Sequence, residues 1–475
     1  MFWVIPLILV FVAIIVIRTL AFTPKKDIFD EAKSISFDKQ KAVDNLAAIL
    51  KCKTISYKDS SLEDNSEFDK LINLLPSLYP NVYKICKLTT FKDRALLFHW
   101  KGTENGDPAV FMSHYDVVPV NYDGWDKDPF GAEIENGVLW GRGALDTKVT
   151  FNAALSAADS LIENGFVPLN DIYFAFSGGE EVNGNGAKHI VEYFKQNAIN
   201  PSIVLDEGGA VVEDVFPGVK APCGLVGIAE KGMIDLCYTS VSNGGHASAP
   251  KPNAPIDSLA NACKTLLSKP FKAHITPPVS KMFDTLGRHS TFLYRMIFAN
   301  LWLFKPVLNL ICKKSGGELN ALLRTTVAFT QMSGSNASNV IPPKATMVSN
   351  IRLNPKDSVS SAIDYISKTI NSNNIELSIL HSTEPSRIST TDCEGWYKLT
   401  KAINDTWQGV IVSPYLMMQC SDSRHYGKIS DKVYRFSAMD LTACERATIH
   451  GNNERIRIET VHRSVEFYIR LISQM

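Results

Sequence analysis

The sequence predicts an α/β fold that carries a smaller, inserted α+β domain. Short apolar segments of strand length, at residues 109–112, 172–176 and 203–205, alternate with segments of helical periodicity. Each of these strands is followed by histidine or acidic residues, as at the C-terminal edge of an open α/β sheet, where sites collect. After about Glu230 this pattern gives way to other segments, and it returns after Leu353.

The composition limits the classes of function. The chain has 475 residues, of which 45% are hydrophobic, enough for two or three domains with a sizeable core. Lys+Arg and Asp+Glu both number 49, so the absence of net charge argues against a nucleic-acid partner. The nine cysteines are odd in number and form no Cys-x-x-Cys pair. Any metal site must therefore use histidines and carboxylates.

The N-terminus predicts a membrane anchor. Residues 2–17 are almost unbroken apolar sequence, slightly short of the roughly 20 residues of a spanning helix, but the side chain of Arg18 can extend to the interface. No basic region precedes the apolar residues and no Ala-x-Ala cleavage site follows them. We therefore expect residues 1–22 to be an uncleaved transmembrane anchor, with a signal peptide as the alternative, and 23–37 to be a tether. The protein is then expected at a membrane; the alternative is a secreted protein or one in a vacuole- or lysosome-like lumen.

The remaining chain is divided into three parts. We expect a catalytic domain from two segments, 38–232 and 356–475, and an inserted lid or dimerisation domain at 233–355. Residues 292–311 within the insertion are apolar and aromatic but are interrupted by Arg295 and Lys305, which favours a buried helix or lid over a membrane span, with a mobile lid that touches a membrane as the alternative. Elsewhere we expect helices at 39–50, 68–78, 153–164 and 187–196, and strands at 95–100, 109–112, 172–176, 203–207, 235–241 and 346–353.

The first candidate ligands follow the strand at 109–112. Residues two apart on a strand face the same side, so His114 and Asp116 project together. A neutral imidazole is a good zinc ligand, and a neighbouring carboxylate can hold its other nitrogen. Asp146 follows a glycine-rich turn at 141–143. By itself this pattern also suits a polar strand end and a structural turn.

Further acids and a second imidazole occur later. Glu180 and Glu181 follow a strand and two glycines, and two adjacent acids at a turn can divide the roles of base and metal ligand. His450 supplies another imidazole. One more carboxylate comes from the Asp206-Glu207 pair, of which only one side chain is expected to reach a metal because adjacent strand residues face opposite ways. Together these residues suffice for two divalent ions that share one carboxylate.

The order of these motifs resembles the dizinc metallopeptidases that include carboxypeptidase S, aminoacylase and glutamate carboxypeptidase. The resemblance is strongest to the branch of carboxypeptidase S and the N-acyl-amino-acid hydrolases, and it runs from about Ala42 to the C-terminus. The motifs that carry it, besides those above, are Cys-Lys-Thr-Ile-Ser at 52–56, Gly-Trp at 124–125, Trp-Gly-Arg-Gly at 140–143, Leu-Asp-Glu-Gly-Gly at 205–209, Gly-Gly-His-Ala-Ser at 244–248, Asn-Val-Ile-Pro at 339–342 and Ser-Asp-Ser-Arg-His-Tyr at 421–426.

The resemblance implies a zinc-exopeptidase-like catalytic domain, two Zn²⁺ per chain and a role for each residue. The implied zinc ligands are His114, Asp146 as the bridge, Glu181, Glu207 and His450. Asp206 is the alternative to Glu207. Glu180 is the implied general base, and Asp116 orients His114. A cis peptide is implied between Asp146 and Thr147, where Thr147 replaces the acidic residue of close relatives.

The inserted domain is expected to complete the site. His246 is a candidate donor to the oxyanion, delivered by domain closure or by a partner chain in a homodimer. The resemblance maps a clamp for the substrate carboxylate onto Asn339 and Arg352, although Arg352 could instead form an ion pair within its own domain. The implied substrates are small peptides or N-acyl amino acids, whose acyl chain residues 292–311 could receive. The alternatives are a non-catalytic membrane-anchored binding protein on the same fold and a lipid-binding protein with vestigial chemistry.

Overall fold

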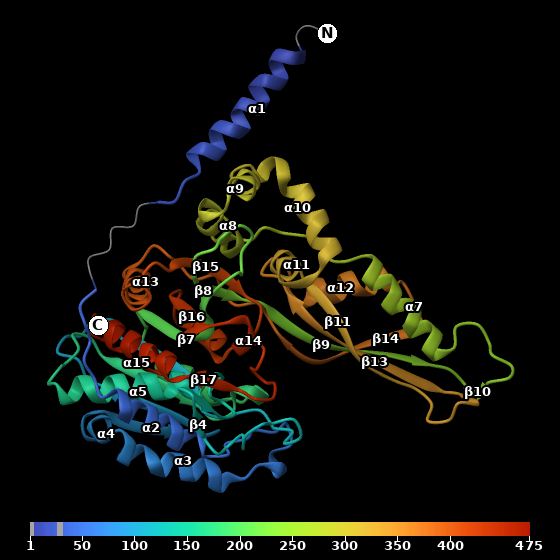
Figure 1. Ribbon diagram of the computed structural model, residues 1–475. Coiled ribbons are helices and arrows are strands. Elements are labelled where there is room, and N and C mark those ends of the chain that lie inside the picture. The colour runs from blue at the N-terminus through green and yellow to red at the C-terminus, as the bar shows by residue number, and fades with distance from the viewer. Residues whose placement is uncertain (1–3, 26–31) are drawn as a thin grey trace.

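The computed structural model describes residues 4–25 and 32–475, and its centre is an eight-stranded mixed sheet (Figure 1). The strand order is β1-β2-β6-β3-β7-β16-β8-β15. In that order the strands are Lys87–Phe91, Ala95–Trp100, Ile172–Ser177, Ala109–His114, Ile203–Val212, Val433–Leu441, Cys223–Glu230 and Ile411–Met417. Strand β3 is parallel to β6 and β7, and β7 is parallel to β16. Their C-terminal ends therefore meet at one edge of the sheet.

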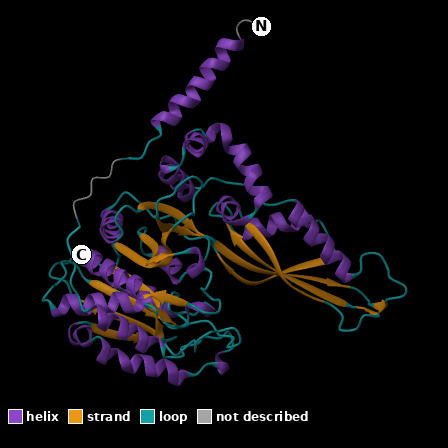
Figure 2. Ribbon diagram, viewed as in Figure 1, coloured by secondary structure: helices purple, strands orange, loops and turns teal. Residues whose placement is uncertain are grey.

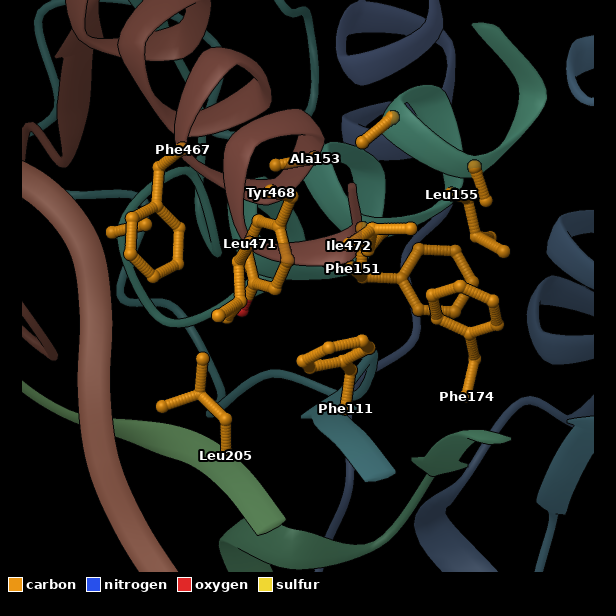
Figure 3. Close-up of a cluster of buried hydrophobic side chains, with 14 of the residues drawn as sticks. Phe111, Phe151, Ala153, Leu155, Phe174, Leu205, Phe467, Tyr468, Leu471 and Ile472 are labelled. Carbon is orange, nitrogen blue, oxygen red and sulfur yellow. The ribbon is translucent and has the colours of Figure 1, made fainter. Parts of the chain in front are cut away.

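Helices cover both faces of this sheet because its strands are apolar on both sides. Phe111 and Phe174 pack toward α5 and α15, as Figure 3 shows, whereas Val110 and Met112 pack toward α6. This alternation follows from the period of two along a strand. The helices of the first face are α2 (Lys39–Leu50), α3 (Asn65–Leu78), α4 (Pro80–Ile85), α5 (Lys148–Glu163), α13 (Glu394–Thr406) and α15 (Ile458–Ile472). On the second face α6 spans Gly186–Gln196.

A second, antiparallel sheet forms the small layer that Figure 2 shows beside the large sheet. Its order is β11-β13-β9-β14, and α7 (Pro255–Ser268) and α12 (Val359–Ile370) pack on one of its faces. The strands are Thr326–Ser333, Lys344–Leu353, Gly232–Val241 and Ile375–Thr383. The predicted α/β fold with an added α+β domain is confirmed.

The small layer extends beyond residue 355, where the sequence placed the end of the insertion. Both α12 and β14 come later, and β14 pairs with β9 over most of its length. Ala362 and Ile366 on α12 are buried against this sheet. A helix followed by a strand has the same local pattern in either domain, so the sequence pattern at this boundary did not show to which sheet the strand belongs.

Residues 277–323 form four helices beside the β8–β15 end of the large sheet. They are α8 (Pro277–His289), α9 (Phe292–Ala299), α10 (Leu301–Ser315) and α11 (Gly317–Leu323). Phe283 and Leu286 of α8 pack against Tyr415 and Leu416 of β15. The segment expected to be a buried helix or lid is thus two surface helices, α9 and α10, each with an exposed apolar side.

Helix α1 (Val4–Ala21) projects from the rest of the molecule beside α9 (Figure 1). It is 18 residues long, strongly apolar and almost wholly exposed, and among the described residues it is the one helix that alone is long and apolar enough to cross a membrane. Residues 1–3 of the expected anchor and residues 26–31 of the expected tether lie outside the described residues.

Candidate metal centre

The first ligand candidate, His114, is the last residue of β3 and is buried. Its Nδ1 lies 3.0 Å from the backbone carbonyl oxygen of Asp116 and 3.4 Å from Asp116 Oδ1. The same carboxylate accepts hydrogen bonds from the backbone amides of Glu180 and Glu181. Asp116 therefore orients the imidazole and also fixes the turn that presents the two acids, while Nε2 of His114 faces the other candidates.

Asp146 lies between the two imidazoles. Its Oδ1 is 3.1 Å from His114 Nε2, and its Oδ2 is 2.9 Å from His450 Nε2. Asp146 precedes α5, and the peptide bond that follows it is cis, which confirms the prediction for Asp146 and Thr147. His450 lies between α14 (Ala443–Arg446) and β17 (Arg455–Arg457). One carboxylate thus joins the ends of two segments that lie far apart in the chain.

The remaining carboxylates come from the neighbouring strands. Glu180 and Glu181 form a short 3₁₀ turn (Glu180–Val182) directly after β6, and Glu207 lies within β7. The distance from Glu181 Oε2 to His450 Nε2 is 3.2 Å, and that from Glu207 Oε2 to His114 Nε2 is 3.4 Å. The parallel arrangement of β3, β6 and β7 is what brings these acids to one place.

Burial and the close approach of several acids shift the pKa values of most of the clustered side chains upward. Burial, reinforced by the charge of Glu207, raises the pKa of Glu180 well above its usual value. Burial also raises the pKa of Glu207 to about 8. Hydrogen bonds to Asp146 and Glu181 raise the pKa of His450 to about 10. Burial opposes a proton on His114, but Glu207, Asp116 and Asp146 together still raise its pKa well above its ordinary value.

Two groups of side chains offer ligand atoms within 4.8 Å of one another. One is His114, Asp146 and Glu181, and the other is His114, Glu180 and Glu207. Of the pair that the sequence left open, Glu207 faces this cluster. Asp206 points away from it, because its Oδ2 accepts a hydrogen bond from the backbone amide of Ser423.

Two residues expected in the site, His246 and Asn339, lie far from the candidate metal ligands of the same chain. His246 is exposed in β10 (Gly245–His246), which pairs with β12 (Val340–Ile341), and Asn339 directly precedes β12. The backbone oxygen of Asn339 accepts a hydrogen bond from the amide of Ala247. Figure 1 shows β10 at the end of the small layer that is remote from the large sheet. The structure therefore brings these two residues to each other and not to the candidate ligands.

Arg352, the third residue expected from the insertion, lies in β13 where that strand approaches the large domain. Its Nε donates to Asn350 Oδ1 at 3.0 Å, and its Nη1 lies 3.4 Å from Cys420 Sγ. Among the described residues, no carboxylate forms an ion pair with Arg352. An ion pair within its own domain, the alternative that the sequence left open, is therefore not what the structure shows.

Two buried carboxylates that sequence reasoning did not single out support the centre. Glu454 accepts hydrogen bonds from the backbone amides of Gly143, Leu145 and Asp146. Asp422 accepts a hydrogen bond of 2.6 Å from the Ser177 hydroxyl, and burial raises its pKa. Asp422 stands in a motif that carried the family resemblance, which was its signal. Nothing local to Glu454 indicates its contacts.

A family model for peptidase family M20/M25/M40 matches residues 110–474, which contain every residue of this centre. The chain belongs to this family. Its members are metallopeptidases and related amidohydrolases, so the predicted resemblance and the enzyme class are confirmed.

Individual relatives and a solved structure of the M20 family also match this chain in sequence or fold. The chain is 35% identical to "Probable carboxypeptidase S-like 2" of Dictyostelium discoideum, over 96% of this chain and 91% of that protein. It is 33% identical to "N-fatty-acyl-amino acid synthase/hydrolase PM20D1" of Xenopus tropicalis, over 92% and 86% of the two chains. The M20 family metallo-carboxypeptidase Sso-CP2 of Sulfolobus solfataricus matches the fold with a TM-score of 0.67 at 18% identity, over 92% of this chain and 99% of that one.

Proposed function

We propose that the chain is a zinc-dependent hydrolase that cleaves the amide bond next to a free carboxylate in N-acyl amino acids or small peptides. The observation that carries this proposal is the convergence of His114, Asp146, Glu181, Glu207 and His450 at one edge of the sheet, with Glu180 beside them. The relatives named for carboxypeptidase and N-fatty-acyl-amino-acid chemistry support the substrate class.

The residues fit two zinc ions. Imidazole and carboxylate ligands suit Zn²⁺, and Asp146 offers one carboxylate oxygen toward each imidazole, 3.1 Å from His114 Nε2 and 2.9 Å from His450 Nε2, as a carboxylate shared by two ions would. The Oε1 atom of Glu181 is buried and has no hydrogen-bond partner among the described residues, as expected of a ligand atom. Burial and the neighbouring acids raise the pKa values of Glu180 and Glu207, and a bound cation would offset that repulsion, which supports a metal site at this position. When bound, two such ions would polarise the amide carbonyl and acidify a water.

Glu180 is the proposed general base. Its backbone amide donates to Asp116, which sets the side chain at the cluster, and Glu181 and Glu207 on either side are assigned to metal. In the reaction, oxygen from water bonds to the amide carbon as Glu180 takes the proton. Glu180 then passes the proton to the nitrogen as the carbon–nitrogen bond breaks. The products are a carboxylic acid and an amino acid or shortened peptide.

Arg352 is the proposed site for the free carboxylate of the substrate. A guanidinium can fork onto a carboxylate through two parallel hydrogen bonds, and in this structure Arg352 has no carboxylate partner among the described residues. Such a contact would select exopeptidase or N-acyl-amino-acid substrates over bonds inside long chains.

His246 and Asn339 are proposed to act on the cluster of a partner chain. They share the end of the small layer that lies away from their own centre (Figure 1). A homodimer that places this end over the partner's cluster would supply the oxyanion donor and the second part of the carboxylate clamp. The apolar helix α1 is proposed to anchor each chain in a membrane.

The decisive experiment compares a panel of N-acyl amino acids and dipeptides with their C-terminally amidated counterparts, on purified zinc-loaded protein. We expect hydrolysis of the free acids and a loss of kcat/KM of about 10⁴-fold on amidation, because the half-buried guanidinium of Arg352 is left without a carboxylate partner. Arg352→Met should reduce this preference. Equal rates on both forms would contradict the clamp, and no hydrolysis of any member would favour the non-catalytic binding protein.

A further inference from the structure

Helices α9 and α10 expose an apolar surface that the described part of the chain leaves largely uncovered. Leu293, Trp302, Val307, Leu310 and Ile311 are each more than half exposed. The opposite side of the pair is packed, since Phe298 contacts Phe216 and Phe283, and Cys312 is buried. The two helices meet at a bend of 110°. The exposed side is therefore a surface feature of a well-packed element.

The charged residues of α9 and α10 are all basic. Residues 291–315 contain Arg295, Lys305, Lys313 and Lys314 and no aspartate or glutamate. Apolar residues beside lysines and a tryptophan are the composition of helices that lie in the interface of a membrane, where anionic headgroups attract the cations. An interface with another protein is usually depleted in lysine at its core.

The helices at 277–315 also contact the C-terminal end of α1 and the residues that follow it. The Arg18 guanidinium donates to the backbone oxygen of Ala299 at 3.1 Å, and Asn300 Nδ2 lies 3.3 Å from Thr19 Oγ1. Arg288 of α8 lies over the Phe22 ring at 4.4 Å and donates to the backbone oxygen of Thr23. These contacts fix α9 at the C-terminal end of α1, on the side of the molecule from which α1 projects (Figure 1).

A contact between two aromatic rings indicates how deeply α10 would lie in a bilayer. Trp302 packs edge-to-face on Phe11 of α1, with 6.0 Å between the ring centroids. Phe11 lies about 10 Å further along the axis of α1 than Arg18, at about 1.5 Å per residue. If α1 crosses a bilayer with Arg18 at its boundary, Trp302 lies beside a residue that is within the acyl-chain region.

We propose that α9 and α10 form a second membrane-contact element, which lies in the bilayer surface beside α1. Trp302 and Leu293 enter the acyl-chain region, and Lys305, Lys313 and Lys314 reach the phosphate headgroups. The proposal rests on the proposed anchoring by α1. It fixes the face that the enzyme turns toward the membrane, since α1 and the α9–α10 surface lie on one side of the molecule.

The test is photo-crosslinking of the full-length protein in vesicles of phosphatidylcholine and phosphatidylserine that contain a phosphatidylcholine with a diazirine on its acyl chain. Mass spectrometry maps the lipid adducts. We expect adducts in α1 and in residues 292–311, and none at Leu267 or Tyr397, which are exposed apolar residues of α7 and α13. Adducts in α1 alone would overturn the proposal and leave the anchor intact, whereas adducts in neither would overturn both. A parallel sample is treated with a bifunctional lysine-reactive reagent; crosslinks between the α10 lysines of two chains, without lipid adducts in residues 292–311, would identify a second copy as the partner and overturn the proposal too.

A variant completes the test. In Leu293→Ser/Leu310→Ser, both substitutions lie on the exposed side, so the packed side and the metal cluster are untouched. We expect adducts in 292–311 to fall to the level at Tyr397 while those in α1 persist, and zinc content to match the wild type. Leu267→Ser is the matched control and should leave the adducts in 292–311 unchanged. Undiminished adducts in the double variant would contradict the proposed face.

Discussion

Glu454 and Arg142 form a fully buried ion pair of 2.6 Å, although 312 residues separate them in the chain. The pair locks the β17 region, which follows the inserted residues, onto the turn that carries Asp146. The second oxygen of Glu454 accepts from the amides of Leu145 and Asp146. The position of the central carboxylate of the proposed zinc centre thus depends on a contact between the two segments of the catalytic domain.

Glu454→Gln should therefore destabilise the protein. It leaves Arg142 buried without its charge partner, and breaking such a buried pair costs about 3–5 kcal/mol in the free energy of unfolding. Urea unfolding of both proteins measures the difference. Glu133→Gln, which removes an exposed pair with Lys127, is the control and should cost less than about 1 kcal/mol. Equal losses in the two variants would show that Glu454 does not hold the turn.

Glu180→Gln should retain zinc and lose turnover. The substitution keeps the shape of the side chain but removes the proton acceptor, whose contribution is typically about 10²–10⁴-fold in rate. Metal analysis and kcat on the same preparation test both parts. The exposed Glu213→Gln serves as control and should keep both properties. A variant with near-normal kcat would remove Glu180 from the mechanism, and one that loses its zinc would make it a ligand.

Zinc should stabilise the folded protein through Asp146. The metal binds the assembled cluster and not the unfolded chain, so at about 100 times its Kd it adds about 2.7 kcal/mol to the free energy of unfolding. Thermal unfolding with and without a chelator measures the shift. In Asp146→Asn most of this shift should disappear, because the carboxylate between the imidazoles is gone. An unchanged shift in that variant would place the stabilising metal elsewhere.

His425 should make the protein sensitive to acid. Burial, together with nearby Arg424, Lys188 and Lys428, lowers its pKa to about 3 in the fold. The unfolded chain takes up the proton below about pH 6.5 while the folded chain does not, so stability is complete above that pH and is lost as the pH falls toward 3. From pH 6.5 to 5 the loss is about 2 kcal/mol, at about 1.4 kcal/mol per pH unit.

His425→Gln removes this titration and should lose correspondingly less stability over the same interval. Urea unfolding at pH 7 and pH 5, with the zinc concentration held constant, compares the two proteins. If both lose the same amount, another group is responsible for the acid sensitivity.

The sequence predicted the parts of the centre that depend on local pattern. His114, Asp146, Glu180 and Glu181 each follow or end a recognisable strand or turn, whereas the family resemblance favoured Glu207 over Asp206 and gave His450 its ligand role. Contacts between distant segments were not accessible in this way. The hydrogen bond from Ser177 to Asp422 spans 245 residues, and neither residue's neighbours indicate it.

The same limit applies to the fold. The continuous apolar run of β3 and the helical period of α2 were interpreted correctly because each element's own apolar pattern identifies it. The sheet to which β14 belongs depends on pairing with β9, which no pattern within residues 375–383 reveals. Whether residues 292–311 are buried or face lipid was left open by the sequence, because apolar composition alone does not distinguish the two.

The place of β16 between β7 and β8 has a consequence for the synthesis of the protein. The ribosome completes β7 and β8 long before it makes residues 433–441. Because β8 pairs only with the last two residues of β7, the rest of that edge of β7 waits for β16. Glu454 and His450 emerge later still. A chain halted within the insertion already carries its N-terminal apolar helix but lacks His450, so a complete zinc centre can form only on a chain translated through the end of the catalytic domain.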